Sequence, residues 1–278
     1  MPFPLCLNSN TYHGFSLEDA VEGASRAGLH LIELAAVAGY TEHVLPDADD
    51  ARIADIQGML RGAGIRAIAL GGHSDLTSAD GRARFVRNLV LAGRLGVAYV
   101  VTGTGETHGD ETQIDDESAF AAELRALGHR ARLEGVSIAI ETHGANYPTG
   151  AAMARLVQAT ASPDVGIAYD TGNTIFYGDV APYDDLAAAL PRVTGLHLKD
   201  KRGGPGVWDF PAIGSGDTDF ERIGRILRAG ESGRVVPLSI EIEFTPEGPA
   251  SVEDVHDALV RSVMHLRSLG FRDEGVRA

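Results

Sequence analysis

Cysteine is almost absent from this chain, whose 278 residues include only Cys6. A single cysteine cannot form an intrachain disulfide, and it excludes a zinc site built from cysteine ligands. Cys6 lies in an apolar run near the start of the sequence, so we interpret it as a buried core thiol and not as a nucleophile. The fold must therefore be held together by its hydrophobic core.

Positive charge is also scarce. The chain has 24 Lys and Arg against 39 Asp and Glu, which gives a net charge of −15 and a pI of about 5.0. An acidic surface repels phosphate backbones, and the sequence contains no run of Lys and Arg that would offset this. We expect no nucleic-acid partner.

Long hydrophobic runs are missing as well. No apolar stretch approaches the roughly 18 residues of a membrane helix, and the opening Met-Pro-Phe-Pro-Leu-Cys-Leu lacks the basic start and the length of a signal peptide. These absences predict a cytoplasmic protein without a membrane partner. The hydrophobic content of 44% is ample for the core of one α/β barrel, a fold of about 250 residues.

Four short apolar runs in the second half of the chain each end on a side chain that can bind a metal. The runs end at Glu141, Asp170, His197 and Glu241. Each has the length and the branched residues of a buried strand, and helix-length stretches separate them, which implies parallel strands. If such a sheet closes into a barrel, all four side chains lie on one rim.

The alternation of residues within these runs favours a barrel over a flat sheet. In the run that ends at Glu141, Ile138 and Ile140 point to one side, whereas Ala139 and Glu141 point to the other. The other three runs repeat this order of small residues followed by a charged one. A flat sheet covered by helices on both faces would be bulky on both.

The whole chain reads as eight strand–helix units in one domain over residues 1–278, which predicts a (β/α)8 TIM barrel. We expect strands near Pro4–Asn8, Leu29–Leu34, Ile65–Leu70, Ala98–Thr102, Val136–Glu141, Val165–Asp170, Val193–Leu198 and Pro237–Ile242. We expect helices near Ser16–Arg26, Ala51–Gly62, Gly81–Leu95, Glu117–Glu134, Gly150–Ala159, Tyr183–Leu190, Phe220–Ala229 and Val252–Leu269.

Five short motifs carry a resemblance to a known family. They are Ile-Glu-Thr-His-Gly at 140–144, Tyr-Asp-Thr-Gly-Asn at 169–173, Leu-His-Leu-Lys-Asp at 196–200, Gly-Ser-Gly-Asp-Thr-Asp-Phe at 214–220 and Ser-Ile-Glu-Ile-Glu at 239–243. With these motifs the chain resembles the xylose-isomerase-like TIM barrels, also called the sugar phosphate isomerase/epimerase superfamily, over essentially its whole length.

The resemblance implies that Glu141, Asp170, His197 and Glu241 bind one divalent metal, and that the two glutamates form the acid/base pair. Three carboxylates and one imidazole make a hard site, so we expect Mn²⁺ first, with Mg²⁺ or Co²⁺ as alternatives. Glu243 shares the strand phase of Glu241 and by phase alone could replace it. The resemblance favours Glu241.

Endonuclease IV is a member of the same superfamily with a different activity. In that enzyme, as the resemblance implies, further histidines hold two more metals. One of these histidines lies three residues after the aspartate of the sixth strand. Here that position is Asn173, and Pro211 stands where the histidine of an Asp-x-His pair with Asp209 would be. The sequence therefore argues against nuclease activity.

We interpret the chain as a metal-dependent isomerase or epimerase of a ketose or keto-sugar derivative. A metal-polarised carbonyl stabilises the enediolate that forms when the neighbouring C–H is deprotonated, and two opposed glutamates can move the proton between faces. A lyase such as an inosose dehydratase or a keto-glycoside-cleaving enzyme is the alternative on the same scaffold. A non-catalytic sugar-binding protein is the alternative outside enzymes. The partner is a small-molecule sugar in each case, and a homo-oligomer is compatible with the sequence.

Five more residues are candidate substrate contacts because they end or follow predicted strands. They are Glu33, His73, His143, Lys199 and Trp208. Glu33 would form a hydrogen-bonding wall, His143 would support Glu141, and Trp208 would belong to a lid. An ion pair with Asp200 is the alternative for Lys199.

Two further features remain open at this point. No glycine-rich phosphate cradle opens a helix, although Lys201 and Arg202 could hold one phosphate. Glu106 and His108 lie in a polar loop, where we expect them to be solvated.

Overall fold

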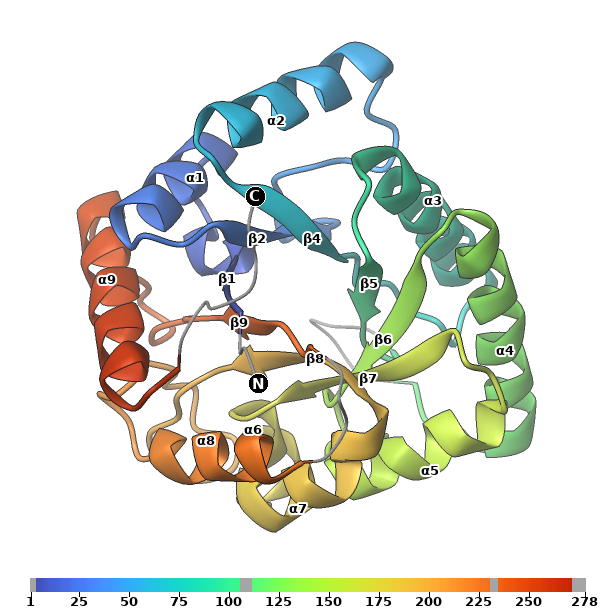
Figure 1. Cartoon of the computed structure of the whole chain (residues 1–278). Helices are drawn as coiled ribbons and strands as arrows, with labels where there is room; N and C mark the ends of the chain where they lie inside the picture. The colour runs from blue at the N-terminus through green and yellow to red at the C-terminus, as the bar shows by residue number, and fades with distance from the viewer. Residues whose placement is uncertain (1–3, 106–111, 231–234, 272–278) are drawn as a thin grey trace.

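The computed structural model describes residues 4–105, 112–230 and 235–271, and these residues form a closed barrel of parallel strands surrounded by helices (Figure 1). The eight barrel strands are β1 (Leu5–Asn8), β2 (Leu31–Val37), β4 (Arg66–Gly71), β5 (Tyr99–Thr102), β6 (Ser137–Glu141), β7 (Val165–Asp170), β8 (Val193–Leu198) and β9 (Leu238–Ile240). Neighbours along the chain pair in parallel, and β1 pairs with both β2 and β9, which closes the ring.

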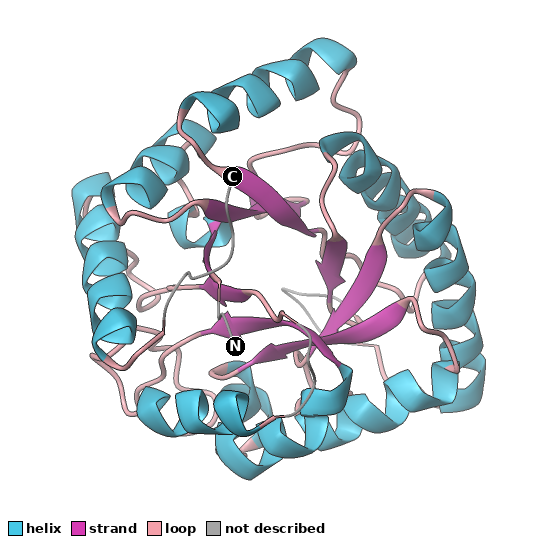
Figure 2. Cartoon of the chain, in the orientation of Figure 1, coloured by secondary structure: helices cyan, strands magenta, loops and turns pink. Residues whose placement is uncertain are grey.

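Helices cover the outside of this ring on all sides (Figure 2). They are α1 (Leu17–Arg26), α2 (Asp50–Gly62), α3 (Ala79–Leu95), α4 (Glu117–Leu133), α5 (Gly150–Thr160), α6 (Asn173–Gly178), α7 (Pro182–Ala189), α8 (Phe220–Ala229) and α9 (Val252–Ser268). Short 3₁₀ turns, η1 (Ser9–Tyr12) and η2 (Leu190–Arg192), follow β1 and α7. The predicted (β/α)8 barrel is confirmed.

The structure differs from the prediction mainly in short elements. The two-residue strand β3 (Thr41–Glu42), which pairs with β2 antiparallel, and helix α6 were not predicted. Helix α6 has only six residues and no side-chain cap. It therefore lacks both the length over which a helical period is visible and the capping residue that marks a helix start. Strand β9 ends at Ile240, which places Glu241 just beyond the strand and not within it.

Side chains fill the inside of the barrel as well as the layer between strands and helices. The interior cluster consists of Cys6, Leu31, Ile68, Ala69, Tyr99, Val101, Ala139 and Ala168. Ile138 and Ile140 instead belong to the core under the helices, as the alternation of the sequence predicted. Cys6 is fully buried, and burial raises the pKa of its thiol, which agrees with a core residue.

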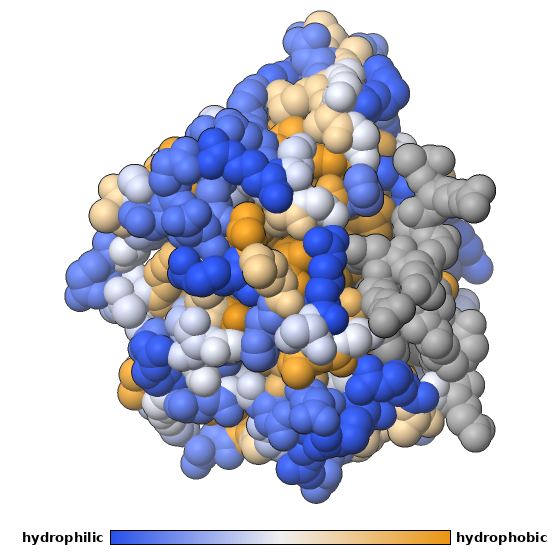
Figure 3. All heavy atoms as spheres, turned by 60° about the vertical axis from the view of Figure 1, so that its left-hand side comes forward, coloured by the Kyte–Doolittle hydropathy of each residue, from blue (hydrophilic) through white to orange (hydrophobic). Residues whose placement is uncertain are grey.

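Hydrophilic side chains predominate on the face of the molecule shown in Figure 3, with hydrophobic groups between them. Among the residues that the structure describes, no helix has the length and apolar character needed to cross a bilayer.

A close approach between α1 and the turn after β1 yields a stability prediction. A Cβ on Gly23 would overlap the Tyr12 hydroxyl, which lies 2.8 Å from Nδ1 of buried His256. We expect Gly23→Ala to lower the free energy of unfolding by about 1–3 kcal/mol, because the core is already filled there. Gly58→Ala in α2 is the matched control, since a Cβ there would meet only an Arg61 nitrogen at 4.0 Å.

The control should stabilise the protein by up to about 1 kcal/mol through its helix propensity. Urea unfolding followed by circular dichroism measures both variants. Equal stability of Gly23→Ala and Gly58→Ala would contradict the packing described for Tyr12.

Candidate metal centre and substrate pocket

Four side chains meet at the carboxyl ends of consecutive barrel strands. Glu141 and Asp170 end β6 and β7, His197 lies near the end of β8, and Glu241 follows β9. All four are buried, and one potential ligand atom from each lies within 4.8 Å of the others. The structure thus brings together the four residues that the sequence singled out, and their role as ligands stays a prediction.

Glu33 fixes the orientation of the His197 ring. Nε2 of His197 lies 3.1 and 3.2 Å from the two carboxylate oxygens of Glu33 and donates to them, while Ser239 Oγ donates to Glu33 at 2.8 Å. The other ring nitrogen, Nδ1, faces Glu141 Oε1 at 2.6 Å and Glu241 Oε2 at 3.5 Å. Nδ1 is therefore the nitrogen that points into the cluster, and Glu33 is the carboxylate that positions it.

Glu141 is held between two histidines. Its Oε1 faces His197, and its Oε2 lies 2.7 Å from Nε2 of His73 at the end of β4. Burial by itself would raise the pKa of Glu141, but the two imidazoles hold that pKa well below its usual value. Glu141 is thus present as a carboxylate and can act as a ligand or a base.

Asp170 and Glu241 share an arrangement in which one carboxylate oxygen accepts hydrogen bonds from amide groups and the other faces a cation. Asp170 Oδ1 accepts from the backbone N–H groups of Gly172 and Asn173 at 2.7 and 2.8 Å. Glu241 Oε1 accepts from the amides of Asn8 and Asn10 at 3.1 and 2.9 Å. The second oxygens, Oδ2 and Oε2, are buried, accept no such hydrogen bond among the described residues, and are instead ion-paired with Lys199 at 3.1 and 2.8 Å.

Lys199 lies beside these two oxygens. Its Nζ is 3.1 Å from Asp170 Oδ2, 2.8 Å from Glu241 Oε2 and 3.3 Å from Glu243 Oε2. Burial would lower the pKa of Lys199, yet the carboxylates hold it well above its usual value. Lys199 is therefore a cation of the site, and the ion pair with Asp200 considered from the sequence is not formed.

Asp200 shapes the loop after β8 instead. Its carboxylate accepts from the backbone N–H groups of Lys201, Gly214, Gly216 and Thr218 at 2.8–3.1 Å. A Cβ on Gly216 would overlap this carboxylate. The Gly-Ser-Gly-Asp motif at 214–217 thus closes the loop that carries Trp208.

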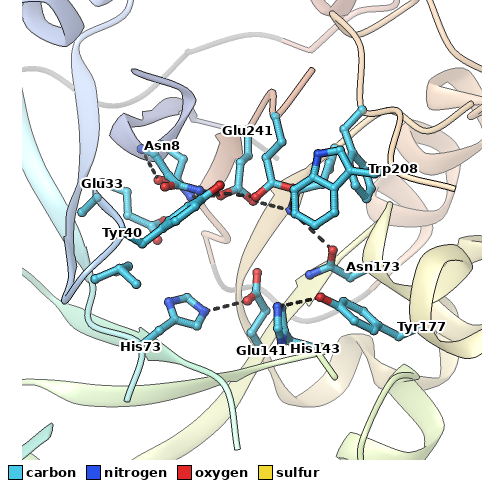
Figure 4. A pocket seen from close by; sticks show the side chains of 17 residues that line it. Asn8, Glu33, Tyr40, His73, Glu141, His143, Asn173, Tyr177, Trp208 and Glu241 are labelled. Carbon is cyan, nitrogen blue, oxygen red and sulfur yellow. Dashed lines mark hydrogen bonds and ion pairs between the residues drawn. The ribbon is translucent and has the colours of Figure 1, made fainter. Parts of the chain in front are cut away.

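Trp208 is one wall of the pocket above the cluster. It is half-buried and packs edge-to-face on Phe176 and Phe210, with ring centroids 5.7 and 5.4 Å apart. On the opposite side His143 Nε2 lies 3.0 Å from the hydroxyl of Tyr177 in α6, so His143 contacts Tyr177, while His73 contacts Glu141 directly. Figure 4 shows Trp208 and Tyr40 on one side of the cavity and His73, His143 and Tyr177 on the other.

We call this cavity the inner pocket. All five residues predicted to contact substrate line it: Glu33, His73, His143, Lys199 and Trp208. Asn173 also lines the inner pocket. Two buried nitrogen atoms of lining residues have no hydrogen-bond partner among the described residues, namely Nδ2 of Asn173 and Nδ1 of His73. Glu106 and His108 lie outside the described residues.

Several lining residues were not singled out from the sequence. They are Asn8, Asn10, Tyr40, Asn173, Tyr177 and Phe210. Glu243 also lines the pocket, although the sequence indicated it only as a possible metal ligand. Asn8 ends β1, so the rule that identified the four cluster residues applies to it as well. Tyr40 and Tyr177 follow strand ends by several residues, and no sequence spacing marks them.

The charges of the cluster fit a divalent cation. Five carboxyl groups line or border the inner pocket, from Glu33, Glu141, Asp170, Glu241 and Glu243, and Lys199 is the one Lys or Arg beside them among the described residues. Burial and the neighbouring carboxylates raise the pKa of Asp170 to about 6 and that of Glu243 to about 7, which shows how closely negative charge is crowded there. Excess negative charge in a buried site is stabilised by a bound cation. Oδ2 of Asp170 and Oε2 of Glu241, whose charge the single ammonium of Lys199 balances only in part, are where such an ion would find ligands.

The comparison with protein families agrees with this geometry. A family model described as xylose isomerase-like TIM barrel matches residues 21–266 of the chain. The chain belongs to this family. The resemblance seen in the five sequence motifs of this xylose isomerase-like protein is thereby confirmed.

Two curated relatives of this xylose isomerase-like barrel carry different activities in their names. The probable L-ribulose-5-phosphate 3-epimerase UlaE of Mycoplasma pneumoniae is 22% identical over 203 residues, 73% of this chain and 63% of that protein. The inosose dehydratase of Bacillus thuringiensis is 34% identical over 89 residues, 32% of this chain. The matched part of the chain thus spans 63% and 30% of the lengths of these relatives.

A solved structure of similar shape is the IolI protein with a bound zinc atom. Its TM-score is 0.77 at 20% identity, and the match covers 96% of this chain and 98% of that one. At this identity the similarity shows that the two proteins share the xylose isomerase-like barrel fold.

Proposed function

We propose that the chain is a divalent-metal-dependent epimerase or isomerase of a keto-sugar, acting through an enediolate, with Glu141 and Glu241 as the acid/base pair. The observation that carries this proposal is the placement of the two glutamates, which approach the inner pocket from opposite sides (Figure 4). The name of the Mycoplasma relative, a 3-epimerase, supports the same class of reaction.

The residues that would hold the cation are Glu141, Asp170, His197 and Glu241. A cation there would polarise a bound carbonyl and stabilise the negative charge that develops on its oxygen. Oxygen-rich ligand sets suit Mn²⁺ or Mg²⁺, and we propose Mn²⁺ first, with Co²⁺ tolerated. The zinc in the IolI structure makes Zn²⁺ a further ion to test.

The chain's own groups perform the proton transfers. A carboxylate on one side of the sugar removes the proton from the carbon next to the carbonyl, and the carboxylate on the other side delivers a proton to the opposite face, which inverts that carbon. Return of the proton to the neighbouring carbon on the same face gives isomerisation. His73 on Glu141, and Asn8 and Asn10 on Glu241, hold the two bases in place for this exchange.

A lyase is the second candidate, favoured by the 34% identity to an inosose dehydratase over 89 residues. It would use the same proton abstraction and then expel an oxygen from the next carbon, which requires an acid near the leaving group. Lys199 and His73 line the inner pocket and can supply such a proton. A non-catalytic sugar-binding protein needs no opposed pair of carboxylates.

Solvent deuterium exchange tests the proposal. The protein loaded with Mn²⁺ is incubated in D₂O with a panel of keto-sugars and followed by NMR. We expect deuterium at the carbon next to the carbonyl, together with the epimer or the aldose. An unsaturated product with a lost hydroxyl would favour the lyase, and no exchange with any member of the panel would contradict both.

Metal content gives a second prediction. Elemental analysis after reloading with Mn²⁺ and desalting should find close to one metal per chain, because the described residues contain one four-residue cluster of this kind. A ratio near three would point to the three-metal arrangement of endonuclease IV, which the sequence argues against.

A further inference from the structure

A second cavity adjoins the inner pocket and leads away from the candidate metal centre. It shares Asn10, Tyr40, Trp208 and Glu243 with the inner pocket and extends to Phe244 and Pro249. Its volume is about 260 Å³, near the lower end of the range for ligand sites. We call it the outer cavity, and a substrate longer than the inner pocket would enter it.

No available cation faces either cavity within the described residues. Among the residues that the structure describes, Lys199 is the one Lys or Arg that lines them. Its Nζ is surrounded by the carboxylates of Asp170, Glu241 and Glu243 at 2.8–3.3 Å. Lys199 therefore balances charge that the site already contains and is not available to a phosphate group.

The two basic residues that follow in the sequence point elsewhere. Nζ of Lys201 donates to the backbone carbonyl oxygens of Arg202 and Gly203 at 2.5 and 3.3 Å, and the side chain is 1% exposed. Arg202 is exposed and pairs with Asp209 at 3.2 Å. Neither residue lines the two cavities, so the phosphate contact considered from the sequence is not available.

The outer cavity is lined by neutral polar and aromatic groups and one carboxylate. His13 stacks on Tyr40 with ring centroids 3.9 Å apart and planes at 14°. Partial burial lowers the pKa of His13, so its ring is neutral at physiological pH. Glu243 and Thr245 can form hydrogen bonds with hydroxyl groups, and Trp208 adds an apolar face. The Asn10 amide is already bonded to Glu241 and Thr41.

We propose, as an inference that rests on the proposed function, that the substrate is an unphosphorylated keto-sugar whose far end lies in the outer cavity. A phosphate dianion there would find no available cation among the described residues that line the cavity, and a charge placed in a partly buried site without a partner is unfavourable. Hydroxyl groups can instead bond to Glu243 and Thr245, and the C–H faces of the sugar can pack on Tyr40 and Trp208.

Matched pairs of substrates test this inference. D-ribulose with D-ribulose 5-phosphate, and D-fructose with D-fructose 6-phosphate, are compared with the Mn²⁺-loaded protein in D₂O, and kcat/KM is taken from the rate of deuterium incorporation. We expect each free ketose to exceed its phosphate by about 100-fold or more, because an unpaired charge in a polar site is strongly discriminated against. A preference for the phosphates would overturn the inference and leave the proposed function intact.

Failure of this inference can be distinguished from failure of the proposed function. If no ketose exchanges deuterium, the proposed function fails, and calorimetric titration of the Mn²⁺-loaded protein with the same pairs still decides the inference. Tighter binding of the free ketoses supports it, whereas equal or tighter binding of the phosphates overturns it.

A charge added to the outer cavity tests where the far end lies. His13→Arg keeps a flat group against Tyr40 and adds a cation, while His13→Gln is the uncharged control. We expect His13→Arg to raise kcat/KM, or affinity, for D-ribulose 5-phosphate about 10-fold relative to His13→Gln. No gain over the control would contradict the placement in the outer cavity.

Discussion

Replacing Glu141 or Glu241 by glutamine is expected to lower turnover about 100-fold or more while much of the metal stays bound. Glutamine keeps the size and one ligand oxygen of glutamate but cannot accept a proton at neutral pH, and a lost general base costs on this scale. Steady-state turnover and elemental analysis measure the two effects. Glu18→Gln, an exposed change on α1, is the control and should change neither.

The two variants should also differ from each other. In an epimerase each base serves one epimer, so each variant should exchange the C–H of only the epimer served by the glutamate that remains. In a lyase there is no such mirror relation, and one variant should keep near-normal exchange without forming an epimer. If Glu241→Gln is silent and Glu243→Gln is inactive, Glu243 is the fourth ligand and our assignment is wrong.

Two of the proposed ligands, His197 and Asp170, have no part in proton transfer, so replacing them should mainly weaken metal binding. We expect His197→Ala and Asp170→Ala each to weaken Mn²⁺ binding about 10-fold or more, since loss of a residue that only orients a ligand already costs 10- to 100-fold. Activity should be partly recovered at high Mn²⁺ concentration. Competition with a fluorescent chelator measures the affinity.

Glu33→Gln is the companion variant, because Glu33 contacts the cluster through the His197 ring. It should lower Mn²⁺ affinity by about 10- to 100-fold, no more than His197→Ala does. Parental affinity in His197→Ala or Asp170→Ala would contradict the four-ligand assignment.

The barrel and its four cluster residues could be predicted from the sequence because both depend on local patterns. Strand length, the alternation around Ile138 and Ala139, and a charged residue at each strand end are visible in single segments. Since parallel strands in a barrel all end on one rim, side chains as distant in sequence as Glu141 and Glu241 are brought together by topology alone.

The partners of these residues could not be predicted in the same way. Asn8 and Asn10 contact Glu241 because β1 pairs with β9 to close the barrel, and no local pattern shows how an amide will be directed. For Lys199 the sequence allows two sets of partners, its neighbour Asp200 or the groups of the site. The four backbone N–H groups that bind Asp200 come from a loop whose course only the folded chain shows.

Glu243 shows that strand phase alone does not choose between two carboxylates near the end of a strand. By alternation it lies on the same face as Glu241, and it does line the inner pocket. Lys199 contacts Glu241 and Glu243 alike, at 2.8 and 3.3 Å, but the four-residue cluster contains Glu241 and not Glu243. Because β9 ends at Ile240, the backbone beyond it need not continue the alternation.

The most direct test of a single divalent metal site built from these four side chains is an anomalous difference map from a crystal of the Mn²⁺-loaded protein. We expect one strong peak per chain, surrounded by Glu141, Asp170, His197 and Glu241 at the distances of metal–ligand bonds, with Nδ1 as the His197 ligand atom. A peak that lacks Asp170 or Glu241 as a ligand, or several peaks in the inner pocket, would contradict the account.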